Sequence, residues 1–205
     1  MHRPSPAPHD RMRTAAPTTM DTIQIDLPQW ARGYGQDRSF GTDEDKMRLA
    51  IDVSRENVRH GTGGPFGAAI FEAGTGALVA IGMNSVVRLN NCTLHGEMVA
   101  IMAAQARLGC FTLRSDDGPV YELVTSCEPC AMCLGATLWS GVRRLVCGAH
   151  RDDAHRLNFD EGPVFPESYA YLEARGIQVV RGVLRDEANA VLEMYRANAG
   201  VIYNG

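Results

Sequence analysis

Two cysteines have the residue type and the spacing of metal ligands. Cys130 and Cys133 are separated by two residues and directly follow Pro129. Proline suits the first position of a helix, so the segment predicts a helix from Pro129 to about Ser140 with both thiols on one face. The positive end of a helix lowers the pKa of a cysteine, and the thiolate is the form that binds metal. This helix start therefore favours two metal-binding thiolates.

The best candidate for a third ligand is His95, which opens a second helical run from Gly96 to Leu108. Three protein ligands leave the fourth zinc position to water, as a catalytic zinc requires. Glu97 follows two residues later, and residues i and i+2 do not share a helix face. We therefore expect His95 at the very start of the helix, where both side chains reach the metal region. Glu97 is then a general acid and base beside the water, not a ligand.

The order H-x-E followed by P-C-x-x-C is the signature of zinc-dependent base deaminases. Three segments closely resemble the guanine deaminase branch of the cytidine deaminase superfamily: GGPFGA at 63–68, HGEMVAI at 95–101 and TSCEPCAMCLGA at 125–136. The similarity extends from about Asp43 to the C-terminus. It implies one zinc per chain and hydrolytic deamination of guanine or a guanine nucleoside. In that reaction zinc-activated water attacks the amino-bearing carbon, and Glu97 carries the proton to the departing ammonia.

The resemblance also implies substrate contacts, each of which has a simpler structural reading. Asn84 matches a substrate-binding asparagine but is also a typical turn residue. Phe66 belongs to the base pocket in relatives, or begins a core strand after a tight turn. Glu161, with Asp160 beside it, matches a substrate-binding carboxylate, or belongs to a solvated acidic loop. Tyr203 matches an aromatic lid, or docks on the surface of its own domain.

Other substrates and one non-enzymatic function remain open. Adenosine in transfer RNA is an alternative because its deaminases share the zinc motifs, although the segment from Leu184 to Ala199 is not basic. Cytosine or a triazine such as ammeline is a further alternative. A zinc-stabilised binding protein without catalysis is disfavoured by Glu97, since a purely structural zinc has no use for an acid beside an open position.

The remaining periodicities predict the elements that position these residues. A helix is expected from a Thr42 cap to about His60, and the strand, metal loop, helix, strand order around Cys130 implies parallel strands. The architecture expected from the resemblance is a three-layer α/β/α fold with a five-stranded mixed sheet, cytidine deaminase-like. The strands are expected at 66–72, 77–83, 120–125, 143–148 and 177–181, and two further helices at 167–175 and 184–197.

Composition limits the organisation of the rest of the chain. Residues 1–20, including His2 and His9, are rich in Pro, Ala, Thr and Arg and are expected to be a disordered tail without function. Residues 21–42 are expected to be an N-terminal extension containing a short strand at 23–27. Residues 43–205 then form the deaminase domain.

Charge and cysteine usage narrow the partners and the compartment. A formal net charge of −4 gives no electrostatic reason to expect nucleic acid or an anionic membrane as partner. The partners are therefore expected to be a small aminated heterocycle and water. Six cysteines do not make a disulfide scaffold in a chain of this length, and the protein is expected in the cytoplasm. The resemblance implies a homodimer, with the C-terminal tail exchanged between subunits in some relatives.

Overall fold

One mixed sheet forms the centre of the computed structural model, which describes residues 24–204. Its strands are β1 (Gly67–Glu72), β2 (Leu78–Met83), β3 (Tyr121–Cys127), β4 (Arg144–Ala149) and β5 (Gln178–Val180), in the order β2-β1-β3-β4-β5. β1 is antiparallel to β2 and β3, whereas β3, β4 and β5 are parallel. The predicted five-stranded mixed sheet and its parallel βαβ unit are confirmed. The predicted tail at 1–20 lies outside the described residues.

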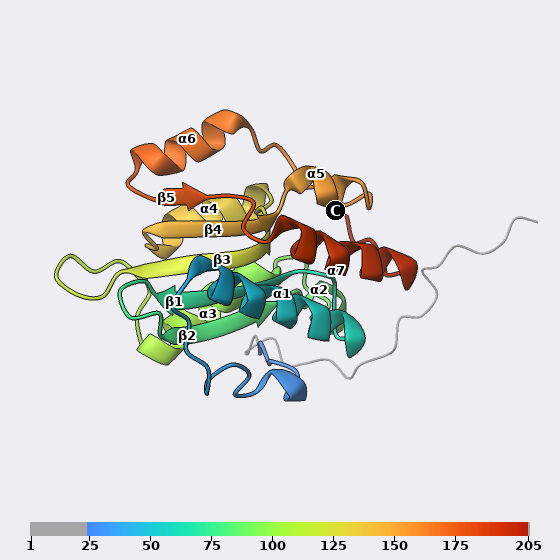
Figure 1. Ribbon diagram of the computed structural model, residues 1–205, viewed down its shortest axis with the longest axis horizontal. Helices are drawn as coiled ribbons and strands as arrows, with labels where there is room; N and C mark the ends of the chain where they lie inside the picture. The colour runs from blue at the N-terminus through green and yellow to red at the C-terminus, as the bar shows by residue number, and fades with distance from the viewer. Residues whose placement is uncertain (1–23, 205) are drawn as a thin grey trace, which may run out of the picture.

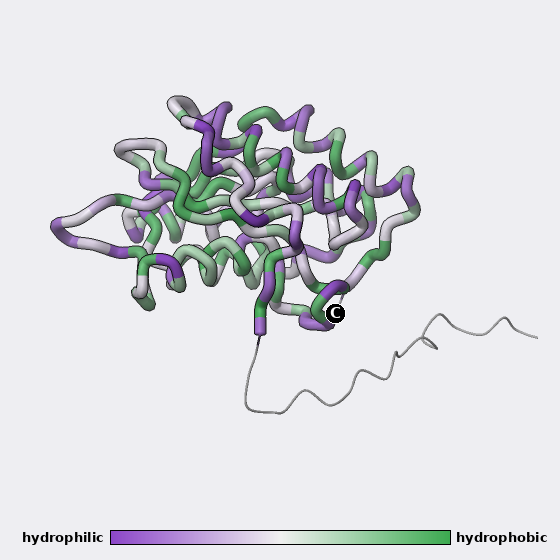
Figure 2. Tube along the Cα trace, turned by 90° about the horizontal axis from the view of Figure 1, so that it is seen from below, coloured by the Kyte–Doolittle hydropathy of each residue, from purple (hydrophilic) through white to green (hydrophobic). Residues whose placement is uncertain are grey.

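Helices cover both faces of the sheet (Figure 1). One face packs against α1 (Asp43–Arg59) and α7 (Arg185–Ala197), and the other against α3 (Gly96–Leu108), α4 (Ala131–Ser140) and α6 (Pro166–Ala174). The sheet residues that face each layer alternate: Ala69 and Phe71 belong to the first core, and Ala68 and Ile70 to the second. Figure 2 shows the hydrophobic strands passing between the helical layers. The three-layer architecture is therefore confirmed.

The start of α1 agrees with its predicted cap. The Thr42 hydroxyl accepts a hydrogen bond from the Asp45 amide at 3.1 Å, and the Asp45 carboxylate accepts one from the Thr42 amide at 3.2 Å. This reciprocal pair satisfies two backbone donors that the first helical turn cannot use. The cap therefore fixes the N-terminal end of α1. Asn57 lies near the other end of the helix, two residues before its last residue.

The N-terminal extension differs from its prediction. No strand is present at residues 24–27; a short 3-10 helix, η1 (Gln29–Ala31), follows them instead. The alternation of apolar residues was not sufficient because the backbone here has no strand partner, and the Asp26 carbonyl accepts a hydrogen bond from Arg88. Within residues 24–204, none of the helices combines the length and hydrophobicity that crossing a bilayer requires.

Two short helices were not predicted: α2 (Val86–Leu89) and α5 (Arg151–His155). α5 is joined to α7 by Asp153, whose carboxylate is buried and accepts two hydrogen bonds from Arg185, both at 2.9 Å. These bonds, with one from the His150 amide, lower the Asp153 pKa to about 2. The buried charge therefore stabilises the folded state wherever it is ionised.

Replacing Asp153 with asparagine should lower the free energy of unfolding by about 2 kcal/mol at pH 7, because charged hydrogen bonds are lost. The folded pKa lies below the ordinary value of 3.8, so the stabilisation is present above about pH 4 and is lost as the pH falls towards 2. The stability difference between wild type and variant should therefore shrink over that interval. Urea unfolding at a series of pH values measures it, and Asp152→Asn, at an exposed position on the same helix, is the control. An equal loss from both variants would contradict the prediction.

Candidate active site

The three proposed ligands come together at the starts of two helices. One donor atom each from His95, Cys130 and Cys133 lies within 4.8 Å of the other two. His95 is the N-cap of α3, which confirms the position expected for it at the helix start. Cys130 is the N-cap of α4, so that helix begins at Ala131 and not at Pro129 as predicted, because Cys130 keeps an extended backbone (φ −67°, ψ 173°).

The donor set suits zinc. One imidazole nitrogen and two thiol sulfurs are a common zinc combination, and three protein ligands leave one position open. The sulfur of Cys130 lies 3.5 Å from Nδ1 of His95. A hydrogen bond from Cys133 and the neighbouring His95 ring stabilise the Cys130 thiolate and lower its pKa to about 4. The residues present can therefore hold the metal.

The remaining cysteines lie elsewhere. Cys127 is buried and its sulfur lies 3.7 Å from the His150 carbonyl, outside the ligand cluster. Burial raises its pKa well above the ordinary value. Cys147 is buried in the core, Cys110 is half-buried and Cys92 is exposed. Cys127 therefore contributes packing at the base of the metal loop.

Glu97 lies one residue inside α3 and is almost fully buried, at 6% exposure. Burial raises the pKa of its carboxyl group, and the nearby Cys130 thiolate raises it further. A carboxylic acid with a raised pKa takes up and releases a proton nearer to neutral pH than an exposed one. Glu97 therefore has the protonation behaviour of a general acid and base beside the ligand cluster.

A small cavity joins these groups to the predicted substrate contacts. Its volume is about 30 Å³, which exceeds the roughly 10–15 Å³ that a cavity needs to hold a water molecule. Phe66, Asp160, Glu161 and Tyr203 line it, so four of the five predicted contacts meet here. Its full lining is Phe66, His95, Glu97, Glu128, Cys130, Phe159, Asp160, Glu161, Tyr203 and Asn204.

Asn84 is the predicted contact that does not line the cavity. It lies directly after β2 and is 1% exposed, and its backbone N–H donates to the Phe66 carbonyl at 2.9 Å. Its side-chain oxygen accepts a hydrogen bond from the Val86 amide at 3.3 Å. Asn84 thus adjoins the cavity wall through Phe66 and also takes part in a turn.

Tyr203 fills the mouth of the site from its own chain. Its ring centroid lies 5.1 Å from that of Phe159 and 6.5 Å from that of His95. Its hydroxyl is buried and has no hydrogen-bond partner among the described residues. A β-carbon on Gly64 would lie 2.0 Å from that hydroxyl. Gly64 therefore lies against the ring of Tyr203, where a larger residue would not fit.

Glu128, Phe159 and Asn204 also line the cavity, and their sequence positions did not predict this. Glu128 is 3% exposed and accepts hydrogen bonds from the Arg181 side chain and from the Arg151 amide. The available sequence signal for Glu128 was an acidic residue inside a loop whose neighbouring residues are buried. Asn204 bonds the Asp160 amide and the Asn158 carbonyl, which ties the tail to the loop between α5 and α6. These contacts join residues that are far apart in the sequence.

Known proteins share both the sequence pattern and the fold. Residues 41–149 match the family described as the cytidine and deoxycytidylate deaminase zinc-binding region. Guanine deaminase from Bacillus subtilis is 39% identical over 131 residues, which cover 64% of this chain and 80% of that protein. The family match at residues 41–149 spans the segments that supply His95, Glu97, Cys130 and Cys133.

Solved structures extend the similarity to nearly the whole described chain. Guanine deaminase from Nitrosomonas europaea superposes with a TM-score of 0.83 at 42% identity, covering 88% of this chain and 100% of that one. A structure solved in complex with 2,6-diaminopurine gives a TM-score of 0.84 at 45% identity, covering 90% and 97%. The fold is thus shared with proteins whose structures hold an aminated purine.

Proposed function

The chain belongs to the cytidine and deoxycytidylate deaminase family, and on that basis we propose that it deaminates guanine in a zinc-dependent hydrolysis. It is a hydrolytic deaminase that acts on an aminated heterocycle. The observation that carries the finer proposal is the convergence of His95, Cys130 and Cys133 within 4.8 Å, with buried Glu97 lining the same cavity. Guanine is favoured because two relatives that are 39% and 42% identical to this chain are guanine deaminases.

His95, Cys130 and Cys133 hold the metal in this proposal. When bound, zinc lowers the pKa of a water molecule towards neutrality. Glu97 would accept a proton from the attacking water and deliver it to the ring nitrogen next to the amino-bearing carbon, while the water oxygen bonds to that carbon. Glu97 would then take the remaining proton of the added hydroxyl group and pass it to the amino group, so that the C–N bond breaks and ammonia leaves. Burial of Glu97 supports both steps, because it raises the carboxyl pKa and so makes the group a better proton acceptor.

The walls of the cavity suit a flat base with polar edges. Phe66 and Phe159 are packed edge to face, with ring centroids 5.0 Å apart, and offer apolar surface to a heterocycle. Glu161 is 8% exposed, and burial raises its pKa to about 8. In this proposal its carboxylate form accepts hydrogen bonds from the amino and ring N–H groups of guanine, and these donors favour its ionisation. Asn84 and Asp160 complete the polar contacts, and Tyr203 covers the base.

Transfer RNA is a poorer fit as substrate. In α7, Arg185 and Arg196 are outnumbered by Asp186, Glu187 and Glu193, and the formal net charge is −4. A surface that neutralises phosphates needs clustered lysine and arginine. The covered cavity also favours a free small molecule over a nucleotide within a folded RNA.

The proposed substrate is tested by ammonia release from guanine, guanosine, adenine, adenosine, cytosine, cytidine and ammeline. Guanine should be turned over with a kcat/KM at least about tenfold above that of any other member, a discrimination of about 1.4 kcal/mol. The proposal would be overturned by preference for adenosine, cytosine or ammeline. Zinc content is measured on the same preparation, and one equivalent per chain is expected.

A further inference from the structure

The N-terminal segment is connected to the active site by a chain of hydrogen bonds. We propose that Trp30, Thr62 and Asn57 are positioning residues that hold the substrate pocket in its binding geometry. The inference rests on the proposed guanine deaminase function and assigns a role to a segment that the reaction itself does not use. Trp30 lies in η1, Asn57 in α1, and Thr62 in the glycine-rich loop between α1 and β1.

The direction of each hydrogen bond is fixed by the chemistry of its donor. The indole nitrogen of Trp30 can only donate, and it lies 3.1 Å from the Thr62 hydroxyl oxygen. Thr62 must therefore accept there, and its own hydrogen is directed to Oδ1 of Asn57 at 2.7 Å. With Oδ1 acting as acceptor, the amide of Asn57 has one orientation, in which both hydrogens of Nδ2 point away from Thr62.

Those two hydrogens hold two carbonyl groups of residues that adjoin the pocket lining. Nδ2 of Asn57 lies 2.9 Å from the Gly64 carbonyl oxygen and 2.9 Å from the Asn84 carbonyl oxygen. Asn57 is fully buried, so no water replaces either bond. Gly64 contacts Tyr203, and Asn84 is hydrogen-bonded to Phe66. One amide group thus sets the spacing between the loop under Tyr203 and the segment that carries Asn84.

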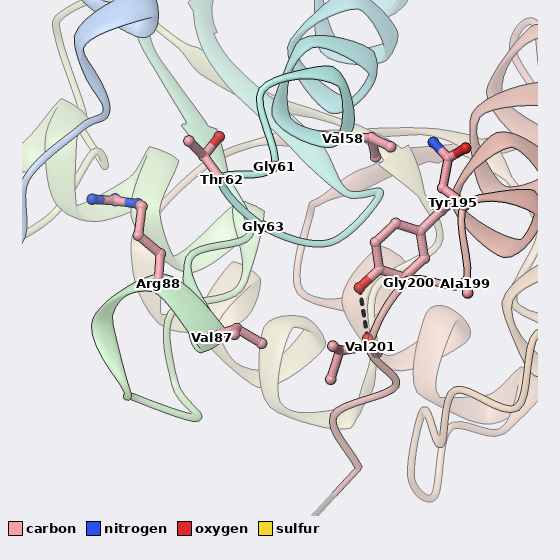
Figure 3. Close-up of a pocket in the computed structure, with 11 residues that line it drawn as sticks. Val58, Gly61, Thr62, Gly63, Val87, Arg88, Tyr195, Ala199, Gly200 and Val201 are labelled. Carbon is pink, nitrogen blue, oxygen red and sulfur yellow. Dashed lines mark hydrogen bonds between the residues drawn. The ribbon is translucent and has the colours of Figure 1, made fainter. Parts of the chain in front are cut away.

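The glycine-rich loop has little other support on its outer side. Figure 3 shows a groove there, where Thr62 and Gly63 face Val201 and Tyr195 across open space. The volume of this groove is about 340 Å³. On the inner side, a β-carbon on Gly63 would lie 1.9 Å from the Asn84 carbonyl oxygen, so the loop is packed tightly against Asn84. Its position therefore depends on the hydrogen bonds to Asn57, which include one from the Thr62 amide to the Asn57 carbonyl at 3.0 Å, and on the contact with Asn84, and not on packing from the groove.

Trp30 is itself held by stacking. Its ring lies 5.5 Å from that of His60 at an interplanar angle of 6°, and 5.7 Å from that of Tyr34 at 89°. Replacing Trp30 with phenylalanine keeps an aromatic ring for these contacts and removes the N–H donor. This variant tests the hydrogen-bond chain without emptying the site of its aromatic group. Asn57→Ala is less informative because it leaves two buried carbonyls unsatisfied and endangers folding.

Steady-state kinetics with guanine test the proposal. Trp30→Phe and Thr62→Val should each raise KM about threefold to tenfold, the range that one lost hydrogen bond corresponds to. The value of kcat should stay within about twofold and zinc content should be unchanged, because neither residue touches the reacting groups. Thr62→Ser retains the hydroxyl and should restore the wild-type KM. Tyr34→Phe removes a polar group from the same segment without breaking the chain, and is the matched control.

A readout that needs no substrate separates this inference from the proposed function. The Phe66 amide donates to the Gly64 carbonyl, and the Asn84 amide donates to the Phe66 carbonyl. Hydrogen exchange of peptides containing these amides should accelerate about threefold or more in Trp30→Phe and Thr62→Val, but not in Tyr34→Phe. If wild type does not release ammonia from guanine, the proposed function fails while the exchange rates still test the inference. Unchanged exchange in both variants, or unchanged KM in an enzyme active on guanine, would overturn it.

Discussion

Replacing Glu97 with glutamine should reduce the rate of ammonia release from guanine by about 10³-fold or more while one zinc remains bound per chain. Glutamine has the size and shape of glutamate, but its side-chain amide cannot accept a proton near neutral pH. General acid and base catalysis contributes about 10²–10⁴-fold in one step. Glu97 is proposed to act in more than one proton transfer, so its loss should be towards the upper end of this range. Stopped-time ammonia assays and zinc analysis of the same sample measure both quantities.

The control for this substitution is Glu44→Gln. Glu44 is an exposed acid in the first turn of α1, on a helix that does not supply a ligand. It should retain wild-type turnover and zinc. A Glu97→Gln enzyme that keeps a tenth or more of the wild-type rate would remove Glu97 from the proposed role. Loss of zinc together with activity would instead assign Glu97 to the metal site.

Replacing Cys133 with serine should remove zinc and lower turnover by about 10³-fold or more. Cys133 is fully buried in the first turn of α4, and a serine hydroxyl does not ionise to replace the thiolate that binds the metal. Zinc affinity should be measured by competition with a chromophoric chelator. Thermal unfolding in the presence of zinc should show a smaller shift than in wild type, because bound metal stabilises the folded state.

Cys127 supplies a close control for this experiment. It is also a cysteine of the metal loop and is 3% exposed, but it lies outside the ligand cluster. Cys127→Ser should keep one zinc per chain and most of the activity, even if its stability falls. The ligand assignment fails if the two variants exchange behaviour, with zinc kept in Cys133→Ser and lost in Cys127→Ser.

Local spacing predicted the parts of this protein that depend on neighbouring residues. The bounds of α3 follow from helical periodicity and from His95 before Gly96, and the Thr42 cap follows from the acids after it. The order of strands around Cys130 predicted parallel pairing because a short crossover allows little else. The four residues proposed for the metal and the proton belong to two short segments, so sequence patterns identify them together.

Contacts between distant segments could not be predicted in the same way. Asn57 is an interior residue of an amphipathic helix, and its bond to the Asn84 carbonyl spans 27 residues. Glu128 is held by Arg181, 53 residues later. Residues 24–27 alternate like a strand, but only the folded sheet determines whether a strand has a partner. Tertiary packing determines these roles, and that packing cannot be inferred from a single sequence.

The covered site has a consequence for the timing of the catalytic cycle. A cavity of about 30 Å³ accommodates water but not a purine, so the ring of Tyr203 must withdraw before a base can enter. Val201 and Ile202, which lead to it, are 59% and 38% exposed, so the withdrawal is opposed mainly by the packing of Tyr203 on Phe159 and by the hydrogen bonds of Asn204. Substrate then enters and product leaves while Tyr203 is withdrawn, and the bond is broken while Tyr203 covers the site. The maximal rate of such an enzyme is limited by the slower of two steps, the opening of the tail or the chemical reaction.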